Sequence, residues 1–169
     1  MTTTRTLVMN PKQVNQRLNR LAWQVYEHCY NEQEIIVAGI SGNGFRLAQR
    51  ITALLGDISP LKVTLCEVNL SKDAPLDGKG SVTPAIASME NKTVIVVDDV
   101  SNSGRTLMYG VKLFLDSPVK ALLTLVLVDR DHTRYPVKAN FVGLSLATTM
   151  QEHISVVENE NGEVAVYLD

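Results

Sequence analysis

Two adjacent carboxylates, Asp98 and Asp99, open the segment of this sequence that is best suited to bind a ligand. They follow the apolar run Val94–Val97 and precede a loop of small polar residues that leads into a predicted helix. Such a loop presents unpaired backbone N–H groups and a positive helix-dipole end, which together bind phosphate. The candidate phosphate-binding residues are Val100, Ser101, Asn102, Ser103, Gly104, Arg105 and Thr106.

The two carboxylates would repel a phosphate bound directly against them, so they must face another part of the ligand. Ionised carboxylates accept strong hydrogen bonds from vicinal hydroxyl groups. Asp98 and Asp99 can therefore hold the 2′ and 3′ hydroxyls of a ribose while the following loop holds its 5′-phosphate. The ligand indicated is a ribose 5-phosphate unit. An Asp-Asp pair followed by an ordinary helix cap is the alternative, because both features are common in α/β sheets.

Other nucleotide-binding loops are excluded, since no GxxxxGK[ST] occurs and no GxGxxG follows a strand. The segment resembles the 5-phosphoribosyl-1-pyrophosphate (PRPP) motif of type I phosphoribosyltransferases, in which an apolar strand and two acids precede a loop ending in Ser-Gly-Arg-Thr. Leu127–Arg130 with His132, then Pro136–Gly143, resemble the bacterial pyrimidine-operon attenuation regulators, which are also uracil phosphoribosyltransferases. The opening helix and the turn Gly39–Gly44 extend this likeness over nearly the whole chain.

The resemblance implies a set of catalytic residues, namely Asp98, Asp99, Lys72 and Arg130. Asp98 and Asp99 would hold the ribose hydroxyls, and Asp129 and Arg130 would lie near the pyrophosphate and the base. The implied cofactor is Mg²⁺, held mainly through the substrate, with Asp129 as a candidate protein ligand. The implied substrates are PRPP and a pyrimidine base, and the product is a nucleoside monophosphate.

Two further segments have implied roles, and both differ from the family pattern. A turn that would bind pyrophosphate contains Ser41, Gly42, Asn43 and Gly44, and it lacks the basic residue common in the regulators. The loop Ser71–Pro84, which carries Lys72, would close over the site and is shorter than usual. Leu144 and Met150 stand where the regulators tend to have basic residues, which weakens an RNA-binding face. Asn102 replaces the acid that purine-specific relatives often use on the base, which disfavours a purine substrate.

Two functions follow from these observations. The first is a Mg²⁺-dependent enzyme that joins PRPP to a pyrimidine base, with uracil as the expected base. The second is a regulator that senses PRPP or a nucleotide and binds RNA, with little or no turnover. The missing cation in the turn favours the second function, whereas the ribose and phosphate motif supports ligand binding under both.

Predicted helices and strands alternate along the chain, and they must position the candidate site residues. Helical spacing of apolar residues predicts helices over Pro11–Tyr30, Phe45–Leu55 and Thr106–Leu115. Apolar runs predict strands over Ile35–Ala38, Lys62–Val68, Thr93–Val97 and Ala121–Val128, with Phe141–Leu144 and Val164–Leu168 as closing strands. The polar segment Asn69–Pro84 predicts a long loop. We therefore expect an α/β protein of the type I phosphoribosyltransferase fold: a mostly parallel central sheet flanked by helices, with a small hood and a flexible lid loop.

Composition limits the remaining possibilities. The chain has 169 residues, 45% of them hydrophobic, and a formal charge of −2, which predicts one folded domain over residues 1–169 without a global cationic field. No segment has the apolar length of a membrane span, so we expect a cytoplasmic protein. Cys29 and Cys66 are expected to be buried free thiols, and Trp23 a core residue of the first helix. The resemblance implies a homodimer or tetramer.

Overall fold

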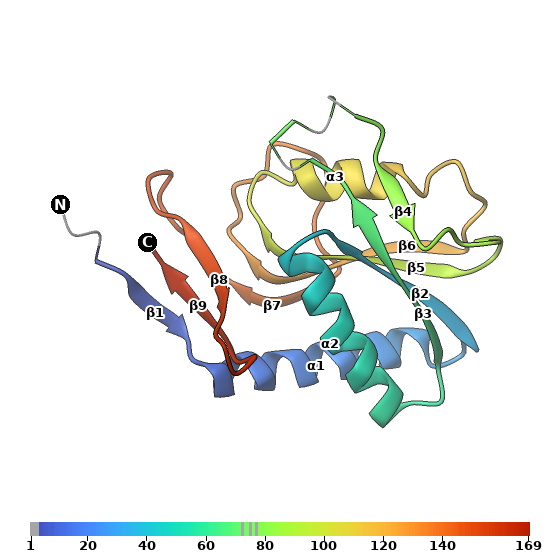
Figure 1. Cartoon of the computed structure of the whole chain (residues 1–169), viewed down its shortest axis with the longest axis horizontal. Helices are drawn as coiled ribbons and strands as arrows, with labels where there is room; N and C mark the ends of the chain where they lie inside the picture. The colour runs from blue at the N-terminus through green and yellow to red at the C-terminus, as the bar shows by residue number, and fades with distance from the viewer. Residues whose placement is uncertain (1–3, 72, 75, 77) are drawn as a thin grey trace.

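A larger α/β body and a smaller sheet beside it make up the structure (Figure 1), a computed structural model that describes residues 4–71, 73–74, 76 and 78–169. The elements, in chain order, are β1 (Thr6–Met9), α1 (Pro11–Cys29), β2 (Glu34–Ile40), α2 (Asn43–Ile58), β3 (Lys62–Asn69), β4 (Ser81–Thr83), β5 (Thr93–Ser101), α3 (Arg105–Lys112), β6 (Ala121–Asp129), β7 (Phe141–Ser145), β8 (Ile154–Glu158) and β9 (Val164–Leu168).

The larger sheet has the strand order β4-β3-β2-β5-β6-β7. Its strands pair in parallel except for β4, which runs antiparallel to β3 at one edge. Strands β2, β5 and β6 are apolar on both faces because helices cover both faces of the sheet. The predicted, mostly parallel central sheet is therefore confirmed. The register pairs Ser101 with Asp129, so the carboxyl ends of β5 and β6 lie side by side.

The helices cover the two faces of this sheet unequally. Figure 1 shows α1 and α2 on one face and α3 on the other. Alternate residues of each strand therefore enter different cores: Val37 and Ile95 pack with α1 and α2, whereas Ile36 and Val96 pack with Leu107 of α3. None of the described helices combines the length and apolarity needed to cross a bilayer.

Strands β1, β9 and β8 form an antiparallel sheet, which we call the hood. The chain enters α1 directly from the hood, where the Asn10 side chain accepts from the Gln13 amide and the Gln13 side chain accepts from the Asn10 amide. Both described chain ends lie in the hood (Figure 1). The hood that the family resemblance implied is therefore present.

Three expectations need correction. Strand β5 runs on to Ser101, so Asp98 and Asp99 belong to the strand and not to the loop after it. The segment expected to be entirely loop contains strand β4, because its Ser81–Thr83 pairs with the exposed edge of β3. Trp23 is not a core residue: 48% of it is exposed, on the face of α1 opposite the buried stripe. Strands β1 and β8 were not predicted, because a short, half-exposed strand has no unbroken apolar run.

Candidate functional site

A cavity of about 620 Å³ opens where β5 ends and α3 begins. Ligands of parallel sheets bind at this edge, outside the carboxyl ends of the strands. The cavity is lined by Asp73, Asp98, Asp99, Val100, Ser101, Asn102, Ser103, Gly104, Arg105, Thr106, Leu107, Arg134, Tyr135, His153 and Ile154. The structure thus brings together the two carboxylates and the whole loop selected from the sequence.

The two carboxylates are held by the backbone that follows them. Asp98, only 2% exposed, accepts from the Asp99 amide through Oδ1 at 2.9 Å. Asp99 accepts from the Val100 amide through Oδ1 at 2.9 Å and from the Asn43 side chain through Oδ2 at 3.1 Å. Both carboxylates also line the cavity, where carboxylate oxygens can accept hydrogen bonds from ligand hydroxyls.

The loop that ends at α3 is built to receive an anion. Gly104 has φ +83°, and a Cβ placed on it would lie 2.8 Å from a methyl carbon of Val137, so the site requires glycine. The Arg105 amide donates to Ser103 Oγ at 3.3 Å, and the next amides of the first turn have no intrahelical acceptor. This helix start therefore offers backbone donors to a phosphate.

Residues after β6 complete the wall beside this loop. The amides of Arg134 and Tyr135 donate to the Ser103 carbonyl at 2.8 and 3.1 Å, which fixes the loop from outside. Sequence reasoning missed Arg134, Tyr135, His153 and Ile154 as cavity residues. A usable signal existed only for Arg134, a cation placed just beyond a strand whose end meets the same edge of the sheet.

The glycine-rich turn contacts the carboxylates but does not line the cavity. A Cβ on Gly44 would lie 2.9 Å from the Val97 carbonyl oxygen and 3.0 Å from Asp98 Oδ1, so only glycine allows this close packing. The Asn43 amide group donates to Asp99 and also to the Val156 carbonyl of the hood, at 3.0 Å. Ser41 and Gly42 complete the turn, and the Ser41 amide donates to the Val68 carbonyl.

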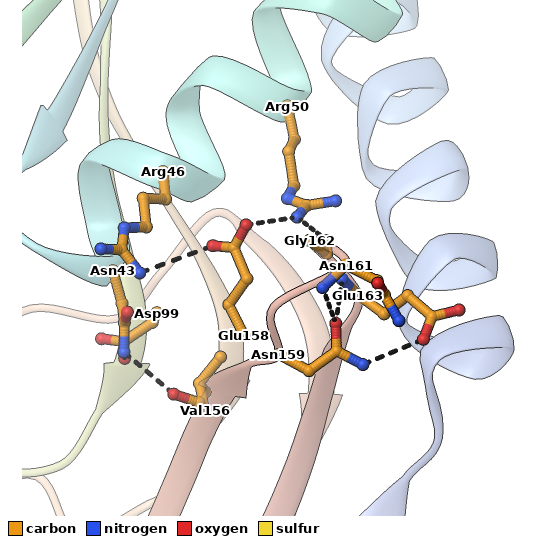
Figure 2. A network of polar contacts seen from close by, with 10 residues as sticks. All are labelled: Asn43, Arg46, Arg50, Asp99, Val156, Glu158, Asn159, Asn161, Gly162 and Glu163. Atoms are coloured by element: carbon orange, nitrogen blue, oxygen red, sulfur yellow. Dashed lines mark hydrogen bonds and ion pairs between the residues drawn. The ribbon is translucent and has the colours of Figure 1, made fainter.

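Helix α2 joins this turn to the hood along one side, as Figure 2 shows. Glu158 of β8 pairs with Arg46 at 3.5 Å and with Arg50 at 3.2 Å, and Arg50 also donates to the Gly162 carbonyl. Arg46, the first cation after the turn along the chain, is thus paired with a hood carboxylate. These contacts and those of Asn43 set the position of the hood relative to Asp99.

Arg130 and Asp129 lie at the end of β6 but not on the cavity wall. Arg130 is 7% exposed and donates to Asn102 Oδ1 at 2.8 Å, so it reaches the site through that side chain. Asp129 Oδ1 accepts from the Asp131 amide at 2.9 Å. His132 Nε2 lies 2.6 Å from the Thr148 carbonyl oxygen. Both residues expected near the base thus adjoin the loop from the neighbouring strand.

The lid segment touches the site where it is described. Asp73 lines the cavity, and its carbonyl accepts from Arg105 Nη2 at 3.2 Å. Lys72, the expected basic residue of the lid, lies outside the described residues.

The expected Mg²⁺ can be tested against the side chains present. Within the described ranges, no group of three or more His, Cys, Asp or Glu residues could hold a metal ion. Asp98 and Asp99 nevertheless supply carboxylate oxygens at the cavity wall. Mg²⁺ is commonly held by one or two carboxylates together with substrate phosphates. The residues therefore fit a Mg²⁺ ion that binds with a phosphorylated ligand.

Comparison with known proteins agrees with this geometry. Residues 9–161 match the family model described as phosphoribosyl transferase domain. The bifunctional protein PyrR of Clostridium kluyveri is 31% identical over 160 residues, which cover 91% of this chain and 90% of that protein. The PyrR of Bacillus pumilus is 32% identical over an alignment of 176 residues, covering 95% and 96%. A hypoxanthine phosphoribosyltransferase of Trypanosoma cruzi shares the fold, with a TM-score of 0.74 at 15% identity over 95% of each chain. The chain belongs to the phosphoribosyltransferase family and has its type I fold.

Proposed function

We propose that the protein converts PRPP and a pyrimidine base into a nucleoside monophosphate and pyrophosphate, and that uracil is its preferred base. The observation that carries this proposal is the cavity in which Asp98 and Asp99 adjoin the loop Ser101–Thr106. A ribose 5-phosphate unit needs acceptors for two hydroxyls beside donors for a phosphate, and this cavity offers both. The match to PyrR relatives over nearly their whole length supports the choice of base.

The reaction displaces pyrophosphate from the anomeric carbon by a ring nitrogen, through a sugar transition state with cationic character. Asp98 and Asp99 orient the ribose, and their negative charge stabilises the positive charge that develops on it. The loop amides, with Arg105 and Arg134, hold the 5′-phosphate. Mg²⁺ would supply charge neutralisation on the leaving pyrophosphate. For Lys72 we propose a role at the closed lid, and for Asp129 a share in the metal site.

The decisive experiment measures pyrophosphate release from PRPP and Mg²⁺ in the presence of uracil, hypoxanthine, guanine or xanthine. Release with uracil and little release with the purines is the expected result. No release with any base would overturn the enzymatic function.

Replacing the two carboxylates proposed to bind the ribose tests the site independently of turnover. UMP at a hundred times its dissociation constant should stabilise the unmodified protein by about 2.7 kcal/mol, visible as a thermal shift. The combined Asp98→Asn and Asp99→Asn substitutions should abolish this shift, because neutral amides lose the charge-assisted bonds to the hydroxyls. A shift that persists in the double variant would show that the ligand binds elsewhere.

A second function, ligand sensing with RNA binding, is favoured by the state of the pyrophosphate turn. Its Asn43 is bound to Asp99 and to the hood, and the nearby Arg46 is paired with Glu158. A turn engaged in this way favours nucleotide binding over PRPP turnover. If RNA is bound, the affinity must fall steeply as salt rises, because phosphate contacts release counterions. Binding assays at several salt concentrations, with and without UMP, test this function.

We further propose a cytoplasmic location and a homodimer or tetramer. The two cysteines are free and buried, which suits a reducing compartment. Light scattering of the purified protein would measure the oligomeric state.

A further inference from the structure

Asn43, the first residue of α2, connects a carboxylate of the site to the hood (Figure 2). Its Nδ2 lies 3.1 Å from Asp99 Oδ2 and 3.0 Å from the Val156 carbonyl oxygen. An ionised carboxylate and a carbonyl can only accept, so the amide nitrogen of Asn43, and not its amide oxygen, must face both. A side-chain amide has two N–H donors, and these two acceptors use both.

The side chain of Asn43 lies in a space that is too small for a pyrophosphate. Asn43 is half-buried and, among the described residues, is not one that lines the cavity at the end of β5. Together with Asp99 it lines a second cavity under the hood, of about 20 Å³, whose other walls include apolar side chains of α1, α2, β6, β8 and β9. That volume has room for about one water molecule. The turn expected to bind pyrophosphate thus directs this side chain to a carboxylate.

The bond from Asn43 completes the support of the Asp99 carboxylate. Asp99 Oδ1 accepts from the Val100 amide at 2.9 Å, and Oδ2 accepts from Asn43. The last torsion angle of an aspartate is intrinsically broad, so bonds at both oxygens are needed to fix the plane of the carboxylate. The apolar walls of the small cavity strengthen the bond to Asn43 relative to one in water. Asp99 also lines the larger cavity, so it presents a preset orientation to a ligand there.

The hood in turn fixes the orientation of Asn43. Val156 belongs to β8, the outer strand of the hood, so its carbonyl can accept from a donor outside that sheet. Alternate residues of β8 contact the same side of the larger body: Ile154 lines the cavity at the end of β5, and Glu158 pairs with two arginines of α2. Asn43 therefore cannot turn away from Asp99 without losing a bond to the hood as well.

We propose that Asn43 is a positioning residue that orients Asp99 towards the ribose hydroxyls, and that it does not itself bind pyrophosphate. The inference rests on the proposed function. Because Asn43 acts through the carboxylate, it should matter for a ligand that has ribose hydroxyls and not for one that lacks them. It should also matter only while Asp99 is present.

The first experiment titrates the full chain calorimetrically with UMP and with its 2′,3′-dideoxy analogue, which differ only in the two ribose hydroxyls. Asn43→Ala should lower UMP affinity about tenfold, the contribution of about one hydrogen bond to a charged group, and leave the affinity for the analogue unchanged. Asn43→Asp has nearly the same size but places a second carboxylate against Asp99, so UMP affinity should fall at least as far. The affinity for inorganic pyrophosphate with Mg²⁺ should be equal in Asn43→Ala and the unmodified protein.

The second experiment is a double-mutant cycle between Asn43 and Asp99. Asp99→Ala should lower UMP affinity by itself. Adding Asn43→Ala to it should lower the affinity by less than about a further twofold, because the carboxylate to be oriented is gone. The matched control is Arg46→Gln, on the same face of α2, which removes a contact to the hood without touching Asp99. It should leave the ratio of UMP affinity to analogue affinity unchanged.

Three results would overturn the inference. Equal loss of UMP and analogue affinity in Asn43→Ala would assign Asn43 to the structure of the turn. Additive losses in the cycle would mean that Asn43 acts without Asp99. Weaker pyrophosphate binding with unchanged UMP binding would assign Asn43 to the pyrophosphate. If the analogue binds too weakly to titrate, the cycle decides. Failure of the unmodified protein to bind UMP would instead overturn the proposed function, and this inference with it.

Discussion

At the residue scale, Gly44 and Gly56 of helix α2 differ sharply in their surroundings. A Cβ on Gly44 would press on the Val97 carbonyl and on Asp98 Oδ1, whereas a Cβ on Gly56 would meet nothing within 4 Å. The first glycine is therefore tied to the position of a carboxylate in the site. The second only reduces the helix propensity of its segment.

This contrast gives a paired prediction. Gly44→Ala should destabilise the fold by about 1–3 kcal/mol, as overpacking does, and should weaken UMP binding because Asp98 must move. Gly56→Ala should stabilise by up to about 1 kcal/mol and leave binding intact. Thermal unfolding with and without UMP measures both effects. Normal UMP binding by Gly44→Ala would mean that Asp98 does not hold the ligand.

The two cysteines give a prediction about pH. Burial raises the pKa of Cys29 and of Cys66 to about 11, and the carboxylate of Glu32 adds to the effect at Cys29. Unfolded thiols ionise near pH 8.5–9, so the folded state holds more protons between about pH 9 and pH 11. The contribution of the thiols to stability is full below about pH 9 and is lost as pH rises towards 11. Urea unfolding across this pH range should show a shallower decline of the unfolding free energy for a Cys29→Ala, Cys66→Ala variant. Equal declines in the two proteins would contradict the assignment of this pH dependence to the thiols.

Sequence alone predicted the residues that lie next to one another along the chain. Asp98 to Thr106 form one continuous segment, and a strand, two acids and a small-residue loop leave few ways to fold. Arg134 and Ile154 enter the cavity from other segments, and their place depends on packing that sequence spacing does not encode. The prediction for Trp23 is wrong because its position along α1 lies opposite the buried stripe, which outweighs the general tendency of tryptophan to be buried.

At the scale of elements, the hood is attached through the strand closest to the site. Glu158 on β8 pairs with two arginines of α2, and the Val156 carbonyl accepts from Asn43. The parallel sheet was predictable, because its buried strands are continuous apolar runs. The hood strands β1 and β8 were not, because they are short and half exposed.

The ionic attachment of the hood can be measured. Glu158→Gln should lower the free energy of unfolding by about 1 kcal/mol or less at low salt, since the ion pairs are partly exposed. The difference in stability between variant and unmodified protein should shrink as added salt screens these ion pairs. Amide exchange in β8 and β9 should accelerate. Glu160→Gln, on the exposed hairpin turn of the hood, is the matched control and should change neither property. Equal effects of the two substitutions would indicate a general charge effect.

At the scale of the whole molecule, the hood and the larger sheet share a core. Met9, Ile154 and Val166 of the hood belong to the same buried cluster as Leu21 of α1 and Val37 of β2. A hood that separated would expose this surface of α1, so separation and global unfolding should occur together.

We therefore expect calorimetry to give a single transition, with equal calorimetric and van't Hoff enthalpies, which moves upward as a whole with UMP. The two buried clusters are built on the same strands, β2, β5 and β6, so they should unfold together. Two resolved transitions, of which only one responds to UMP, would show that the hood is a separate folding unit.

Strand β7 is the outer strand at its side of the sheet, and outer strands are where sheets of different molecules join. Here Arg17 donates to the Gly143 carbonyl at 3.1 Å, and Arg20 donates to the carbonyls of Val142 and Gly143 at 3.1 and 2.6 Å. Two arginines of the first helix thus bind two successive carbonyls of this outer strand, of which one points towards the open edge. The same contacts that dock α1 on the sheet therefore also hinder this edge from pairing with a strand of another molecule.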